Sequence, residues 1–522
     1  MRMLSAVGAK MIWAGMAVSL LFACAPASAP PAAPQSYESD LTTDMFSAGY
    51  ESIADFFIDP IPTDALALSA LNGLSTLQND LRFVQRRGKL IVMKADAEFA
   101  EFPSPDADET TRWARLTAAA IGAARRSSVE LAAIDNEALF SATFGAMVGK
   151  LDKYSRYLGA DDAQREKNAR TGYTGIGIQI FEDRGGFYVT RVFAGSPAEE
   201  AGLESGDQIL RVAGKPVQGL AIEELVRRLK GPPGTNVFVT LERDTIPYNA
   251  DITRRKVIQP TIVARDYGSI AYFFVQSFNQ NTAQSLEEAI EAHQKRRAGA
   301  TTSAVILDLR HNRGGPLNQA IEVADLFLDE GRILTTQGRH TNSQQKFSAE
   351  QGQKFEGVPM VVLIDSESAS SAEIVSSALQ DQRRALLIGA RSFGKGTVQQ
   401  IITLPNSGEM ILTWARMRTP SGYALSRFGV FPSICTANFS SAEEALQQLR
   451  DGELNPGAEI RRRHALEHAS PAKQQEFDQW CKSRRQISED DEDIKLARAL
   501  LEAPHLYELA LNASTLALAK PN

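Results

Sequence analysis

The sequence contains few residues of the kinds that bind metals or cross-link a chain. Its 522 residues include only 3 Cys and 6 His. None of them form a closely spaced cluster, so we expect no metal, no iron–sulfur cluster and no other cofactor. The chain also lacks an excess of positive charge, because 56 Lys and Arg stand against 63 Asp and Glu, for a net charge of -7. This balance would repel a polyanion and argues against nucleic acid as a partner. The 43% hydrophobic content is that of an ordinary globular chain of about three or four domains.

A short hydrophobic run lies near the N-terminus. Met11–Ala23 follows two basic residues and has the length of a signal-peptide core, so we expect residues 1–23 to direct export. The run ends at Leu21-Phe22-Ala23-Cys24, which resembles a bacterial lipobox, and this predicts lipidation of Cys24 after cleavage. Cleavage after Ala29 is the alternative and would release a soluble exported protein.

Residues 24–40 are rich in Pro and Ala and predict an extended tether. Because Ala25 gives no signal for retention in the inner membrane, we expect a bacterial periplasmic protein anchored to the outer membrane. Cys435 and Cys481 then remain as an even pair in an oxidising compartment, which favours a disulfide between them.

Periodicity divides the rest of the chain into four parts, and the expected fold class is multidomain α+β. Residues 41–160 show apolar residues three or four positions apart and predict a helical N-terminal region. Residues 161–250 have Gly-rich turns and short strand patterns around one helix at Ile222–Lys230. Residues 251–434 alternate strand and helix patterns, and residues 435–522 form a charged helical extension.

The alternation in the third part predicts βαβ crossovers and a largely parallel sheet. The predicted strands are 304–309, 360–364 and 386–388, and the helices between them are 317–328 and 371–379. The extension after residue 434 is either a dimerisation surface or a brace held to the core by the predicted disulfide, and we favour the brace.

Glycine-rich motifs in the second part resemble those of a PDZ domain. The motifs are Gly175-Ile176-Gly177-Ile178, Gly195-Ser196-Pro197-Ala198, Ala201-Gly202-Leu203 and Gly206-Asp207-Gln208-Ile209-Leu210. Gly175 and Gly177 allow successive N–H groups to converge on a carboxylate, and a strand from Ile178 offers an edge to an extended peptide. We therefore expect protein or peptide partners with apolar C-termini. The alternative is that these glycines only form hairpin corners.

Two junctions between strands and helices in the third part suit acyl-transfer chemistry. They are Asp308-Leu309-Arg310-His311-Asn312-Arg313-Gly314-Gly315-Pro316 and Asp365-Ser366-Glu367-Ser368-Ala369-Ser370-Ser371-Ala372-Glu373-Ile374. Free N–H groups at the start of a helix can form an oxyanion hole, and a hydroxyl there lies near the positive end of the helix dipole. A third segment, Ser392-Phe393-Gly394-Lys395-Gly396-Thr397-Val398-Gln399, has a Lys between two glycines.

Together with Leu151–Leu158, these segments resemble the carboxyl-terminal processing protease family, over about Phe46 to Pro432. The resemblance implies an α/β protease core of the crotonase/ClpP-like type in a serine endopeptidase that binds substrate C-termini through its PDZ domain. It implies the following roles: nucleophile Ser370, general base Lys395, supporting residue Gln399, and oxyanion N–H donors Gly314 or Gly315 together with Ser371.

Three positions depart from the family pattern. Ser371-Ala372 inverts the usual order after the nucleophile, Lys153 replaces the usual Pro, and Ser433 follows Pro432 where an acidic residue is usual. The inversion leaves neighbouring serines as candidates, but the spacing to Lys395 favours Ser370.

The chemistry restricts the surroundings of Lys395. A general base must be neutral, so the pKa of Lys395 must fall from about 10.4 to about 7, which burial can achieve. Gln399 can orient the amine without adding a negative charge. On a straight strand these two residues would be about 13 Å apart, so Gly394 and Gly396 must bend the chain.

Other residues near these motifs receive secondary roles. His311 is the rival base, but no Asp partner accompanies it in the motif, so a solvent-facing loop residue is favoured. Glu373 is expected to be a charge at the start of a helix, and Asp308 and Arg310 are expected to be structural. A catalytically weak PDZ scaffold that binds C-terminal peptides of envelope proteins is the alternative function, and a homodimer or an adaptor remains open.

Overall fold

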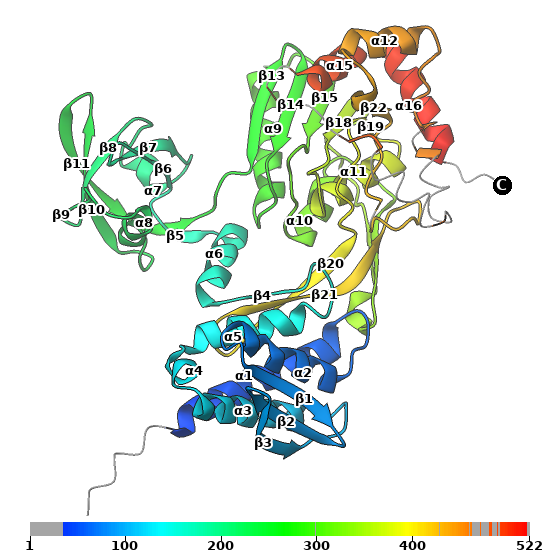
Figure 1. The fold of residues 1–522 in the computed structure, drawn as a ribbon. Helices are drawn as coiled ribbons and strands as arrows, with labels where there is room; N and C mark the ends of the chain where they lie inside the picture. Colours follow the sequence, from blue (N-terminus) through cyan, green and yellow to red (C-terminus); the bar gives the residue numbers. More distant parts are fainter. Residues whose placement is uncertain are drawn as a thin grey trace, which may run out of the picture.

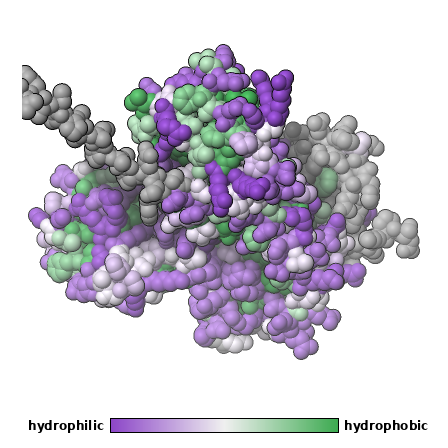
Figure 2. All heavy atoms as spheres, turned by 90° about the horizontal axis from the view of Figure 1, so that it is seen from below, coloured by the Kyte–Doolittle hydropathy of each residue, from purple (hydrophilic) through white to green (hydrophobic). Residues whose placement is uncertain are grey.

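A computed structural model describes residues 35–297, 299–426, 428–458, 460–461, 470, 480–482, 488 and 491–518. The expected signal peptide, Cys24 and the first part of the expected tether lie outside the described residues. No helix in the described ranges combines the length and the apolar character needed to cross a bilayer. The surface seen in Figure 2 is mainly hydrophilic, and its hydrophobic residues form separate small areas.

The N-terminal region forms one end of the molecule (Figure 1, blue to cyan). Its helices are α1 (Gln35–Phe56), α2 (Thr63–Gly73), α3 (Thr110–Ser127), α4 (Val129–Ala133) and α5 (Asn136–Val148). Phe46, Tyr50 and Ile53 recur at helical spacing and are fully buried between these helices, as the periodicity predicts.

The same region also contains an antiparallel sheet that the sequence analysis missed. Its strands are β1 (Leu81–Arg86), β2 (Lys89–Lys94) and β3 (Ala97–Pro103). Two-residue turns join the strands, at Arg87-Gly88 and Ala95-Asp96, and all four turn residues have positive φ. Arg and Ala are unusual at such positions, so the turns lack the Asn-Gly or Asp-Gly signature of a hairpin.

A PDZ-like module, residues 173–257, stands to one side of the rest of the molecule (Figure 1). Its main sheet has the order β11-β10-β8-β7-β6, with β9 paired to β8. The elements are β6 (Ile178–Asp183), β7 (Gly186–Val192), α7 (Pro197–Glu200), β8 (Gln208–Val212), β9 (Lys215–Pro216), α8 (Ile222–Leu229), β10 (Asn236–Arg243) and β11 (Ile246–Thr253). The module enters and leaves through β5 (Tyr173–Gly175) and β12 (Arg255–Val257), which pair with each other. Helix α6 (Ala160–Thr171) precedes β5.

The protease-like core contains a sheet with the order β13-β14-β15-β18-β19-β22 among the described strands. Its strands are β13 (Ile262–Tyr267), β14 (Ile270–Val275), β15 (Ala304–Asp308), β18 (Met360–Ile364), β19 (Leu386–Gly389) and β22 (Ile434–Cys435). Every pair from β14 to β22 is parallel, which confirms the expected crossovers.

Helices cover both faces of this sheet, and alternate strand residues point to each face. Val305 and Leu307 pack with α9 (Thr282–Arg296), α10 (Leu317–Asp325) and α11 (Ser371–Asp381). The opposite face packs with α12 (Ala442–Arg450), α15 (Glu492–Leu501) and α16 (Pro504–Leu518), so part of the C-terminal extension braces the sheet. The mixed architecture with a helical N-terminal region confirms the expected fold class.

A second sheet joins this core to the N-terminal region (Figure 1). It contains β16 (Arg332–Gln337), β17 (Gln345–Ser348), β20 (Thr397–Thr403) and β21 (Glu409–Arg418), and β4 (Arg156–Leu158) pairs with β21. Leu404, Met410 and Leu412 of the β20–β21 hairpin are buried in the N-terminal hydrophobic core. The hairpin therefore anchors both parts of the chain.

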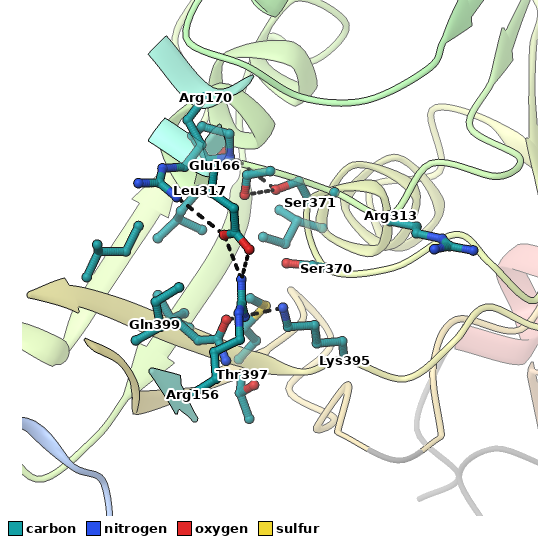
Figure 3. Close-up of a pocket in the computed structure, with 18 residues that line it drawn as sticks. Arg156, Glu166, Arg170, Arg313, Leu317, Ser370, Ser371, Lys395, Thr397 and Gln399 are labelled. Carbon is teal, nitrogen blue, oxygen red and sulfur yellow. Dashed lines mark hydrogen bonds and ion pairs between the residues drawn. The ribbon is translucent and has the colours of Figure 1, made fainter. Parts of the chain in front are cut away.

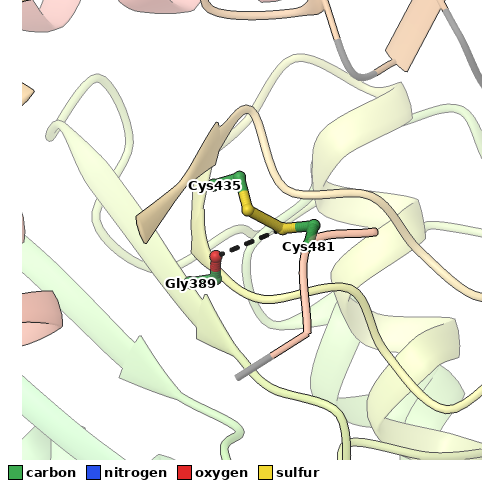
Figure 4. Close-up of a disulfide and its surroundings, with 3 residues drawn as sticks. All are labelled: Gly389, Cys435 and Cys481. Carbon is green, nitrogen blue, oxygen red and sulfur yellow. Dashed lines mark hydrogen bonds between the residues drawn. A yellow bond between two sulfur atoms is a disulfide. The ribbon is translucent and has the colours of Figure 1, made fainter. Parts of the chain in front are cut away.

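Cys435 and Cys481 form a disulfide, with their Cα atoms 5.9 Å apart (Figure 4). The Cys481 carbonyl also accepts a hydrogen bond from the Arg391 N–H at 2.9 Å. The disulfide thus holds a segment of the C-terminal extension beside the chain that leads to Lys395.

Candidate active site

A cavity of about 340 Å³ lies between the protease-like core, α6 and the β20–β21 hairpin. Ser370, Lys395 and Gln399 all line it (Figure 3), although they come from separate segments of the chain. Gly314, Gly315 and Ser371 line it as well. The structure thus brings together all six residues to which the family resemblance assigns a catalytic role.

Ser370 precedes α11 in an unusual backbone conformation. Its φ is 56° and its ψ is -112°, a combination that non-glycine residues rarely adopt. Such strain persists only where the surroundings hold the residue, and it is frequent at active sites. The Ser370 N–H donates to Glu373 Oε2 at 2.8 Å, which helps to hold this turn.

The hydroxyl groups of the neighbouring serines have structural partners. Ser371 Oγ donates to the Gly315 carbonyl at 2.9 Å, and Ser368 Oγ donates to the Leu309 carbonyl at 2.9 Å. The Ser370 hydroxyl donates to no described residue and points toward the cavity (Figure 3). Among these serines, Ser370 is the one whose proton is free for catalysis.

The glycine loop approaches this serine closely. A Cβ atom on Gly314 would lie 2.8 Å from Ser370 Cβ and 2.9 Å from Ser371 N, so only glycine fits. The Gly314 N–H donates to Asn312 Oδ1 at 2.8 Å and is therefore occupied. The N–H groups of Gly315 and Ser371 have no acceptor in the described parts of the chain, which makes them the better pair of oxyanion donors.

Gln399 lies within reach of Lys395. Lys395 Nζ donates to Gln399 Oε1 at 3.2 Å, and Gln399 Nε2 donates to the Tyr154 carbonyl at 2.8 Å. The expected bend is present, because β20 begins only at Thr397 and its pairing with β21 shifts register at Val398/Gln399. Gly394 contributes with a φ of 89°.

Burial lowers the pKa of Lys395 below its ordinary value, and the nearby Arg156 cation lowers it further. Glu373, Glu166 and Asp152 act in the opposite direction but do not cancel the shift in pKa. The direction is the one that a lysine acting as a general base requires.

Glu373 has a larger role than the charge at the start of a helix that the sequence suggested. It is fully buried and accepts four hydrogen bonds. Oε2 accepts from the N–H groups of Ser370 and Lys395 at 2.8 and 2.9 Å, and Oε1 accepts from Gly394 N and Ser392 Oγ. Burial raises the pKa of Glu373, and these hydrogen bonds oppose the rise. A Glu three residues after a Ser is a capping-box signal, but the link to Lys395 depends on tertiary structure.

Arg310 connects the glycine loop to the C-terminal extension. Its guanidinium is 1% exposed and pairs with Asp308 at 2.6 Å, Asp491 at 2.8 Å and Asp493 at 3.2 Å. Tyr272 also donates to Asp308 at 2.9 Å. The structural role expected for Asp308 and Arg310 therefore extends to the start of α15. Among the described residues, no group of His, Cys, Asp or Glu side chains is arranged to hold a metal ion.

His311 has an acidic partner that its own motif does not contain. Its Nδ1 lies 3.2 Å from Asp365 Oδ2, while its side chain is 49% exposed. His311 does not line the cavity of Ser370. His311 therefore faces solvent, as expected. The expectation that it has no Asp partner is wrong, because Asp365 lies beside it.

A set of charged residues at the cavity wall was missed by the motif analysis. Arg156 pairs with Glu166 at 2.8 Å, and Arg170 lies 3.5 Å from Glu166 (Figure 3). Arg170 also pairs with Glu409 of β21 at 2.8 Å. Glu166 and Arg170 belong to α6, which leads into the PDZ-like module. No local pattern marks them, because the set forms only when α6 meets β4 and β21.

The PDZ-like module has a separate apolar groove of about 200 Å³. The residues singled out for peptide binding, Gly175-Ile176-Gly177-Ile178, line it together with α8 residues Val226 and Leu229. β6 is the last strand in the sheet order, so one of its edges is unpaired within that sheet. The N–H groups of Ile176 and Gly177 donate to no acceptor among the described residues, as an anion-binding turn requires.

Comparisons with known proteins agree with this architecture. The model of peptidase family S41 matches residues 269–436, and a PDZ domain model matches residues 188–243. A carboxy-terminal-processing protease of Bartonella bacilliformis is 36% identical over 303 residues, covering 58% of this chain and 70% of that protein. A carboxyl-terminal-processing protease of Synechocystis sp. is 33% identical over 297 residues, covering 55% and 68%. A solved structure of a photosystem II D1 C-terminal processing protease is 27% identical with a TM-score of 0.34, covering 57% and 82%. With its motifs and these two relatives from Bartonella bacilliformis and Synechocystis sp., the chain belongs to peptidase family S41, as a carboxy-terminal processing serine protease that contains a PDZ domain.

Proposed function

We propose that this protein is an exported endopeptidase that captures substrate C-termini in its PDZ groove and cleaves peptide bonds with Ser370 and Lys395. The observation that carries the proposal is the cavity that gathers Ser370, Lys395, Gln399 and two free N–H groups. The lowered pKa of Lys395 supports its role as the base.

The proposed reaction starts with neutral Lys395. Its amine donates one hydrogen to Gln399 and keeps a lone pair that can accept the Ser370 proton. Ser370 Oγ attacks the peptide carbonyl, and the N–H groups of Gly315 and Ser371 stabilise the developing oxyanion. Lys395 then returns the proton to the leaving amine, and water hydrolyses the acyl-enzyme.

In the structure, the Lys395 amine forms a hydrogen bond with Gln399 and none with Ser370. Catalytic contacts often tighten only when substrate is bound, so the Ser370–Lys395 contact is expected to form in the complex. We further propose that a ligand in the PDZ groove favours this state. The β5–β12 pair joins that groove to α6, whose Arg170 pairs with Glu409 at the cavity wall.

Export and membrane attachment rest on the N-terminal sequence. The run Met11–Ala23 and the lipobox-like end at Cys24 support a lipid anchor on the periplasmic face of the outer membrane. Mass analysis of the mature N-terminus tests this proposal. An unmodified N-terminus after Ala29 would contradict it and would favour a soluble periplasmic protein.

The decisive experiment uses a peptide with an apolar C-terminus. Ser370→Ala and Lys395→Ala should each abolish its cleavage and leave its binding unchanged, while Ser371→Ala should retain cleavage. Cleavage by Lys395→Ala would exclude Lys395 as the base. No cleavage by the wild-type protein, with binding retained, would instead favour a PDZ scaffold without catalysis.

A further inference from the structure

Lys230 is a partly buried cation in the PDZ groove. It directly follows α8 and lines the groove, with its Nζ atom 4.7 Å from the centre of the Tyr173 ring. No Asp or Glu of the described residues forms an ion pair with it. Burial lowers the pKa of Lys230, and no charged neighbour offsets this effect. Its amine contacts an aromatic ring and has no acidic counter-charge in the described part of the chain, so a cation at this position in an apolar groove calls for an explanation.

Capping of the helix does not explain the position of this amine. The last carbonyls of α8 already have a donor, because Arg254 donates to the carbonyls of Leu229 and Arg228 at 2.9 Å each. The Lys230 amine is therefore not required at the end of α8. It instead extends along Tyr173 at the rim of the groove.

The Lys230 side chain lies beside the glycine turn of the groove, and both line the same pocket. A Cβ atom on Gly175 would meet the Tyr173 ring at 2.8 Å and Lys230 Cγ at 3.7 Å, so both side chains pack over this turn. The free N–H groups of Ile176 and Gly177 belong to the same turn. The apolar groove thus offers two backbone donors and one ammonium group, and the described residues that line it include no Asp or Glu.

We propose that Lys230 binds the α-carboxylate of a peptide C-terminus that lies in this groove. The ammonium group pairs with one carboxylate oxygen, and the N–H groups of Ile176 and Gly177 serve the other. Hydrogen bonds between charged groups are stronger than neutral ones, so Lys230 adds both affinity and selectivity for a free acid. The adjoining apolar side chains receive the last residue of the ligand. This inference rests on the proposed capture of C-termini by the PDZ domain.

The test compares two ligands on the full chain carrying Ser370→Ala, which prevents cleavage. One fluorescent peptide ends in Val with a free carboxylate, and the other is the same peptide with a C-terminal amide. Fluorescence anisotropy gives both Kd values. Lys230→Met should weaken binding of the acid about tenfold and leave the amide unchanged, so that the preference for the acid is lost. Lys230→Arg should keep most of the preference.

Lys215→Met is the matched control, because Lys215 is an exposed lysine on β9 of the same domain. It should leave both Kd values unchanged, and circular dichroism should show that all variants are folded. If Lys230→Met retains the wild-type preference for the acid, Lys230 does not bind the carboxylate. The proposed capture of C-termini by the PDZ domain would still stand. If the parent chain binds acid and amide equally, the proposed capture of C-termini fails and the role of Lys230 fails with it.

Discussion

Glu373 accepts hydrogen bonds from the backbone N–H groups of Ser370 and Lys395 through the same carboxylate oxygen, at 2.8 and 2.9 Å. One buried side chain thus fixes the distance between the turn that carries the nucleophile and the loop that carries the base. The side chain touches neither the substrate nor the reacting atoms, so Glu373 is a positioning residue.

Replacement of Glu373 should therefore impair the chemistry more than substrate binding. Gln has one acceptor oxygen in place of two, so Glu373→Gln leaves some of the four donors without a partner. We expect kcat to fall by about 100-fold with little change in KM, which steady-state kinetics would show. Glu367→Gln, at a half-exposed residue three positions before Ser370, should leave kcat unchanged. A fall in stability without a fall in kcat would contradict the positioning role.

The pH dependence of catalysis should follow Lys395. Only its neutral form can accept a proton, so kcat/KM should rise with pH through the pKa of Lys395. Burial, followed by Arg156, places this pKa below that of an ordinary lysine. Arg156→Gln removes the cation, so the pKa should increase and the rise in kcat/KM should move to higher pH.

Arg165→Gln provides the control for this experiment, because Arg165 lies on α6 but is exposed and pairs with Asp162. Its pH profile should match the wild type. An unchanged profile for Arg156→Gln would show that Arg156 does not tune the base.

Loss of the disulfide should affect both stability and activity. Cys435 and Cys481 are 46 positions apart, and closing a loop of this size stabilises a fold by about 2 to 4 kcal/mol. Cys435→Ser combined with Cys481→Ser should lower the unfolding free energy by this amount. Because the Cys481 carbonyl holds the Arg391 N–H close to the Lys395 loop, kcat should also fall. Denaturant unfolding and peptide cleavage, each with and without reductant, measure the two effects. If reductant changes neither the unfolding free energy nor kcat of the wild-type protein, the disulfide has neither role.

Asp491 should stabilise the protein through two contacts. Its carboxylate pairs with Arg310 and also accepts hydrogen bonds from Asp493 N and Ile494 N at the start of α15. Asp491→Ala removes the cap and one counter-charge of a buried cation, and we expect a loss of about 2 to 3 kcal/mol in unfolding free energy. Asp451→Ala, at an exposed residue after α12, should change stability by less than about 0.5 kcal/mol. If the two variants lower the unfolding free energy equally, Asp491 does not stabilise the protein through Arg310 and the start of α15.

Periodicity predicted much of the core, and the resemblance to a protease family pointed to the residues of the catalytic cavity. The strand β15 and the helix α11 lie where periodicity places them, and Ser370, Lys395 and Gln399 line one cavity. The patterns could not predict contacts between distant segments. Asp365 is 54 positions from His311, and Asp491 is 181 positions from Arg310, so no motif contains either pair. The N-terminal sheet was missed for another reason, because its turns use residues that seldom adopt positive φ.

The pairing of β5 with β12 makes the PDZ domain an insertion in the protease chain. Gly175 and Arg255 are direct partners in this pair, so the polypeptide leaves and returns at neighbouring points. Residues 176–254 can therefore be viewed as a cassette whose two ends are already joined by backbone hydrogen bonds. A short flexible linker between these ends would give a minimal protease in which the catalytic centre is separated from its peptide-binding domain without a break in any strand of the core.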